Sequence, residues 1–263
     1  MQGYAAFMLV ILAANVMQGI TGFAGTILAM PPSLMLVGYP VAKPVLNVLG
    51  LLSGVYVFVG QRRQVRWDEV RRIVAIMAAG IVVGVLIQGA FEGREQVLYR
   101  CLGAFIVVLA LQGGWVLLRD GRKAGEDGTA KAAPSNATDA VTQGLGARVG
   151  SLALLSAAGV VHGIFVSGGP LLIGYLTKRL TDKASFRATI STVWIFLNGL
   201  VLVQDVMAGR WTPGLLAVQA ISIPFLLAGM FIGARLYARM DQRLFMLLTY
   251  VLLLISGISL LVK

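Results

Sequence analysis

Two stretches of this chain place polar side chains and glycines deep inside long apolar segments. The first reads Gln18-Gly-Ile-Thr-Gly-Phe-Ala-Gly25, and the second reads His162-Gly-Ile-Phe-Val-Ser-Gly-Gly-Pro170. A helix interrupted by glycine leaves backbone N–H groups at the start of the helix that follows, where the dipole also favours negative charge. Pro170 suits such a start, because a first-turn residue needs no N–H partner. Both stretches therefore predict a site for a small anion.

The two stretches are related by an offset of 144 residues, which continues along the chain. At this offset Gln18 corresponds to His162, Asn47 to Ser191, and the pair 66–67 (Arg-Trp) to the pair 210–211 (Arg-Trp). Duplicated halves that contain broken apolar helices are typical of transporters whose substrate site lies at the interface of the repeats.

We expect the helices after the breaks to begin around 24–26 and 169–171, with free N–H groups aimed at the membrane midplane. No Lys or Arg lies in the predicted apolar core, so an anion would depend on helix dipoles and neutral donors. The candidate substrate-binding residues are Gln18, Thr21, Gly22, Phe23, Gly25, Asn47, His162, Ser167, Gly168, Gly169, Ser191 and Thr192.

Each candidate also has a purely structural interpretation. The glycines can serve only to let helices pack closely, and Ser and Thr hydroxyls in membrane helices often bond to their own backbone. His162, the single histidine, can carry a coupled proton or act as a neutral hydrogen-bonding group. Gly80-x-x-x-Gly84 and Gly229-x-x-x-Gly233 are typical of helix packing.

Composition points to an integral membrane protein. Hydrophobic residues make up 58% of the chain and charged residues 13%, with a mean hydropathy of +0.85, which leaves too little polar surface for a soluble fold. The net charge of +11 does not indicate a nucleic-acid partner, because the basic residues lie between apolar runs; we expect them to face anionic lipid headgroups. The single cysteine, Cys101, excludes an internal disulfide.

The charge-free runs predict how the chain threads the membrane. They cover 1–42, 44–61, 73–91, 101–118, 149–177, 188–204, 211–234 and 244–262. As one helix, 1–42 would be about 63 Å long, about twice the hydrocarbon thickness, so it must turn back or break. If 1–42 and 149–177 are hairpins that return to their side of entry, 17 basic residues face one side and five, including Lys43, face the other. The positive-inside rule then makes the first side cytoplasmic and places both termini outside.

The predicted fold class is an all-α integral membrane protein of two inverted repeats, each a re-entrant or broken helical hairpin plus three transmembrane helices. The first transmembrane repeat covers 1–118 and the second covers 149–263. Residues 119–148, rich in small, polar and charged residues, form the predicted flexible cytoplasmic linker. Whether the first hairpin is re-entrant or crosses fully stays open.

The pattern resembles the TauE/SafE family of membrane anion transporters, often described as sulfite exporters. The resemblance rests on Gly19-x-x-Gly22-Phe23-x-Gly25, Gly168-Gly169-Pro170, Ala188-x-x-Ser191-Thr192 and Asp241-x-Arg243-Leu-Phe245. It implies transport of sulfite, sulfonates or related organosulfur anions across the cell inner membrane, generally outward, although uptake is also attributed to some members. The chain departs from the family pattern at 165–167, where a further glycine is common, so its substrate can differ.

Other functions stay open at this point. The apolar segments offer no Asp or Glu pair and no Cys/His cluster, so an intramembrane enzyme, a metal or another cofactor is not expected. The alternatives to sulfonate export are uptake, proton-coupled transport of another small anion, or a membrane scaffold without transport. A homo-oligomer is possible on any of these interpretations.

Overall fold

The computed structural model describes residues 2–90, 145–166, 168–176, 179–180 and 182–237, with scattered positions between 97 and 115 and between 251 and 261. Every regular element in the described part is a helix, which confirms the all-α prediction. The elements are α1 (Gln2–Thr21), α2 (Gly25–Val37), α3 (Tyr39–Gln61), the short 3₁₀ helix η1 (Arg62–Gln64), α4 (Trp67–Ala90), α6 (Leu145–Phe165), α7 (Gly169–Leu176), α8 (Lys183–Met207) and α9 (Pro213–Tyr237).

Five of the described helices are long and apolar enough to cross a membrane: Gly3–Thr21, Tyr39–Gln64, Trp67–Ile87, Ala184–Met207 and Pro213–Leu236. The predicted spans 101–118 and 244–262 are described only at scattered positions, and most of the linker 119–148 lies outside the described residues. α2, with 13 residues, is only about 20 Å long and cannot cross alone. Among the described residues the charge-free runs therefore predict the apolar helices, but they place the division at Lys43, whereas α2 ends at Val37 and α3 begins at Tyr39.

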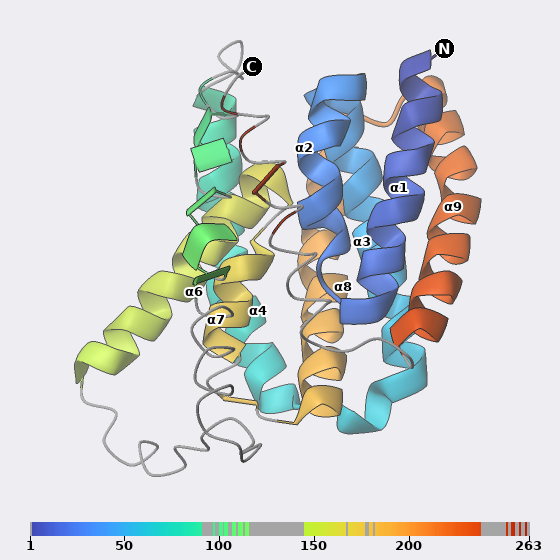
Figure 1. Ribbon diagram of the computed structural model, residues 1–263. Helices are drawn as coiled ribbons and strands as arrows, with labels where there is room; N and C mark the ends of the chain where they lie inside the picture. The colour runs from blue at the N-terminus through green and yellow to red at the C-terminus, as the bar shows by residue number, and fades with distance from the viewer. Residues whose placement is uncertain are drawn as a thin grey trace.

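Two apolar segments are interrupted at the glycine-containing stretches, as the sequence predicted, and each forms a helical hairpin. The first hairpin joins α1 to α2 through a tip at 22–24, and the second joins α6 to α7 through a tip at 166–168. Figure 1 shows α1 running into the bundle from one end and α6 running in from the opposite end. Gly22 has a φ of +81°, a left-handed conformation that glycine adopts without strain and that reverses the chain.

Each hairpin packs on a helix from the other half of the chain. α1 lies against α9, α6 lies against α4, and α3 and α8 pack together at the centre. Such an exchange of partners is what a pseudo-twofold axis between the halves would produce. The inverted repeat itself remains a prediction.

Small residues make both of these contacts close, as the two glycine motifs predicted. A methyl group added to Gly80 would lie 2.6 Å from the carbonyl oxygen of Ser156 in α6, and one added to Gly229 would lie 2.7 Å from that of Leu12 in α1. Gly84 and Gly233 meet the backbone at Val160 and Val16 in the same way. The structural interpretation of these four glycines is confirmed.

Candidate functional site

The tip of the first hairpin hydrogen-bonds its own backbone. Thr21 Oγ1 accepts from the N–H of Phe23 at 3.2 Å and from that of Ala24 at 3.1 Å. Gln18 Oε1 accepts from the N–H of Gly25 at 2.7 Å and so caps α2. The expectation that these N–H groups are free is therefore wrong: Gln18 and Thr21, on the last turn of α1, lie close enough to reach them once Gly22 reverses the chain.

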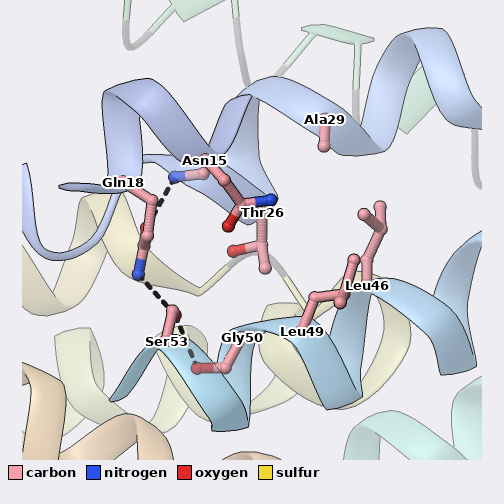
Figure 2. Close-up of a pocket in the computed structure, with 9 residues that line it drawn as sticks. Asn15, Gln18, Thr26, Ala29, Leu46, Leu49, Gly50 and Ser53 are labelled. Carbon is pink, nitrogen blue, oxygen red and sulfur yellow. Dashed lines mark hydrogen bonds between the residues drawn. The ribbon is translucent and has the colours of Figure 1, made fainter. Parts of the chain in front are cut away.

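A small cavity lies beside this tip, between α1, α2 and α3. Gln18 Nε2 donates to Ser53 Oγ at 3.0 Å and to the carbonyl of Gly22 at 3.2 Å, so the side chain joins α1 to α3 across one wall (Figure 2). The volume is about 10 Å³, room for about one water molecule. The cavity is lined by Asn15, Gln18, Gly25, Thr26, Ala29, Leu46, Leu49, Gly50 and Ser53.

The tip of the second hairpin is built differently. Val166 has a φ of +54°, at the position that corresponds to Gly22 in the first half. A β-branched residue is strained in this conformation, and Val166 is only 1% exposed, so its burial offsets the strain. Ser167, a predicted site residue, lies outside the described residues.

His162 lies at the end of α6, fully enclosed. Its ring stacks on Trp194 of α8, with centroids 5.0 Å apart and planes inclined by 27°. Asn198 interacts with the imidazole, yet neither ring nitrogen makes a hydrogen bond of ordinary geometry to a described residue. His162 is therefore packed as a buried aromatic side chain, and it does not cap α7 as Gln18 caps α2.

The two tips meet near the middle of the bundle. A methyl group placed on Gly169 would lie 2.7 Å from Cδ1 of Ile27 in α2 and 3.6 Å from the Trp194 ring. At the repeat offset Trp194 corresponds to Gly50, which lines the cavity beside the first tip. In the second half the Trp194 indole thus stands where Gly50 lines the cavity in the first.

The remaining predicted side chains lie on the two central helices. Asn47 Nδ2 donates to the carbonyl of Asn198 at 2.9 Å, which ties α3 to α8. Ser191 Oγ lies 3.4 Å from the carbonyl of Gly22, at the first tip. The Thr192 hydroxyl donates to the carbonyl of Ala188 in its own helix at 2.7 Å, which is the structural interpretation of this hydroxyl.

Two further predicted residues lie at the hairpin tips. Gly168 packs against Cβ of His162 and the carbonyl of Ala158, while Phe23 meets Phe186 edge-to-face at 6.4 Å.

Comparison with known proteins decides the family. The sequence profile described as "Sulfite exporter TauE/SafE" matches residues 7–260. The chain belongs to the TauE/SafE family. It is also 28% identical over 207 residues, 75% of its own length and 73% of the relative's, to the "Probable inner membrane transporter protein TsaS" of Comamonas testosteroni. No solved structure matches the chain. This TauE/SafE protein is therefore a multi-pass membrane transporter, as the sequence resemblance implied.

Within the described ranges, no group of three or more His, Cys, Asp and Glu side chains lies close enough to hold a metal ion.

Sequence reasoning missed several polar residues at this TauE/SafE site. Ser53, Thr26 and Asn15 line the cavity, and Asn198 meets both Asn47 and His162. Ser53 lies one helical turn beyond Gly50, a spacing that places both residues on the same side of α3. That signal becomes readable only once α3 is placed beside the first tip.

Two cations contradict the expectation that the core holds no Lys or Arg. Lys43 was predicted in a loop at the membrane surface, but α3 begins at Tyr39 and the Lys43 side chain is 1% exposed. Arg187, predicted at the cytoplasmic surface, reaches inward and donates from Nη2 to the carbonyl of Gly19 at 3.0 Å. Lys43 was misplaced because its helix already begins at Tyr39, and Arg187 because its long side chain carries the guanidinium to the first hairpin.

Proposed function

We propose that this TauE/SafE protein is a secondary transporter that carries small organosulfur anions, such as sulfite and sulfonates, outward across the cytoplasmic membrane. The observation that carries the proposal is the small cavity beside the tip of the first hairpin, whose lining includes polar side chains. There, Gln18 and Ser53 place amide and hydroxyl groups beside the break between α1 and α2. Irregular backbone at membrane depth is stable only where it is buried in protein or lines such a cavity.

Alternating access follows from the size of the site. Room for about one water molecule is too small for sulfite, so the hairpins must separate before an anion can enter. Because each hairpin packs on a helix of the opposite half, movement of one half against the other would open one tip while closing the other. We therefore place the substrate where the tips meet.

Export needs no second ion. A monovalent anion that leaves a cell with a negative interior gains about 2.3 kcal/mol per 100 mV of membrane potential, enough for a gradient of roughly fiftyfold. Proton coupling through His162 is thus an option and not a requirement. Uptake, which some members of the family are said to perform, would need a coupling ion to overcome the same potential.

Counterflow in proteoliposomes tests the proposal. Vesicles that contain the purified protein and unlabelled sulfite should accumulate external radiolabelled sulfite transiently, and excess taurine or another simple sulfonate should compete. Protein-free vesicles give the background. Counterflow of none of these anions would remove the organosulfur substrate class, and the absence of any anion binding would favour a membrane scaffold.

The orientation of the chain is a separate prediction. We expect both termini outside and the 119–148 linker in the cytoplasm, because this threading divides the basic residues 17 to five. With the exposed Cys101 replaced by serine, single cysteines can be introduced at Ser135 and Lys263. In right-side-out membrane vesicles, an impermeant maleimide should label Lys263→Cys and not Ser135→Cys. The reverse labelling pattern would invert the proposed topology.

Replacement of His162 by glutamine should preserve transport. The substitution makes position 162 identical to its repeat counterpart, Gln18. The Gln18 amide caps a half-helix in the first hairpin. We expect flux within about threefold of the original, since only the packing on Trp194 is lost.

The matched change, Gln18→Leu, removes both the cap of α2 and the bond to Ser53 and should lower flux at least about tenfold. Equal losses in both variants would show that the imidazole is as important as the Gln18 amide, and a pH dependence lost only in His162→Gln would identify proton coupling.

A further inference from the structure

The two core cations are related by the same offset as the hairpins. Lys43 and Arg187 are 144 residues apart, and each is the fifth residue of a central helix, α3 or α8. α3 and α8 pack side by side in opposite directions: Gly54 meets Ser191 and Gly50 meets Asn198. The two cations therefore lie toward opposite ends of the central helix pair.

Arg187 lies at the tip of the first hairpin. Its guanidinium donates to the carbonyl of Gly19 in the last turn of α1. A methyl group added to Gly22 would lie 2.9 Å from Cγ of Arg187, so the side chain runs directly along the tip. The helix α2 begins at Gly25, close to this side chain. The guanidinium charge therefore adds to the positive potential at the N-terminus of α2.

Lys43 has the corresponding place at the second hairpin. Its charge acts on His162 at the end of α6. One turn earlier on α3, the Tyr39 hydroxyl donates to the carbonyl of Ile164 in the last turn of α6. The Lys43 ammonium lies 5.8 Å from the centroid of the Tyr39 ring, which places the cation on the face of α3 that meets the second tip.

The surroundings of the two cations differ in charge. Lys43 interacts electrostatically with Asp205, a carboxylate that is 1% exposed and forms an ion pair with Arg210 at 2.8 Å. At the repeat offset, Asp205 corresponds to the neutral Gln61. Only one of the two cations thus has an acidic residue at this position.

The cations also differ in exposure. Arg187 is partly exposed, whereas Lys43 is enclosed. The structure therefore encloses the cation at the second tip more completely than the cation at the first. A transporter that alternates access needs such a difference between its two sides.

We propose that Lys43 and Arg187 are a repeat-related pair of anion-binding residues, each serving the substrate from one side of the membrane. Asp205 supplies the opposite charge near Lys43 when the anion is absent. The inference rests on the proposed function and deepens it by supplying the positive charge that the sequence expectation lacked. Sulfite and sulfonates suit both residues, because their oxygens accept charge-assisted hydrogen bonds from ammonium and guanidinium groups.

The test is sulfite binding to purified protein, measured by isothermal titration. Arg187→Gln and Lys43→Gln should each weaken binding at least about tenfold, as expected for the loss of a charged hydrogen-bond donor. Arg187→Lys keeps the charge but not the fork of guanidinium donors, so it should weaken binding less than Arg187→Gln does. Arg71→Gln is the control for surface charge, because Arg71 pairs with Asp68 on an exposed helix face.

Asp205→Asn separates substrate binding from a structural role. The amide keeps a hydrogen-bond acceptor for Arg210 but no longer competes for Lys43, so sulfite should bind several-fold tighter. A residue that only stabilises the fold would give unchanged or weaker binding, and that result would overturn the role of Asp205 and Lys43 even if Lys43→Gln failed to fold.

The outcomes also separate this inference from the proposed function. Binding to the original protein that is unchanged in Arg187→Gln and Lys43→Gln would overturn the pair and leave organosulfur transport intact. If the original protein bound neither sulfite nor a simple sulfonate, both proposals would fall together.

Discussion

Leucine in place of Gly169 should reduce transport to the background of protein-free vesicles while leaving an inserted, folded protein. A side chain at this position would enter the space where the hairpins meet, and its first carbon would lie 2.7 Å from Cδ1 of Ile27. Because that atom is the free end of a flexible side chain, Ile27 can move aside and the bundle can accommodate the change. The substrate, which we place between the tips, would then be excluded.

The matched control is Gly199→Leu in α8. No described residue outside the adjoining helix backbone lies within 4 Å of a methyl group added there, so the same substitution in a membrane helix should leave flux unchanged. Counterflow and size-exclusion profiles would be measured for both variants. Normal counterflow in Gly169→Leu would place the substrate path away from the hairpin tips.

A single methyl group at either glycine helix contact should destabilise the protein by about 2–3 kcal/mol, because backbone atoms cannot move aside as a side chain can. Gly80→Ala would press on the carbonyl of Ser156 in α6, and Gly229→Ala would press on that of Leu12 in α1. Each contact holds one hairpin against the opposite half, so both variants should melt at lower temperature in detergent.

Gly199→Ala again provides the comparison, since it adds the same methyl group to a helix where no described neighbour lies within 4 Å. Its melting temperature should match or slightly exceed that of the original protein, because alanine favours helix over glycine. If Gly80→Ala melted at the temperature of Gly199→Ala, the close contact between α4 and α6 would not limit stability.

The sequence determined the features that depend on neighbouring residues. Long charge-free runs predict membrane helices because the hydrocarbon core accepts little else. Glycines within those runs predict breaks, and the structure ends α1 at Thr21 and begins α2 at Gly25 and α7 at Gly169. The family could be recognised from the same glycines, since each marks a turn or a close approach along one stretch of chain.

Tertiary structure decided which groups surround the candidate site. Gln18 reaches Ser53 only because α3 lies beside the first hairpin. Trp194 packs against His162 and Gly169 only because α8 lies beside the second hairpin. No local pattern fixes the register of these distant helices. The burial of Lys43 shows the same limit: a lysine next to an apolar run predicts a surface loop, whereas the carboxylate of Asp205, far along the chain, supplies the opposite charge that makes its burial tolerable.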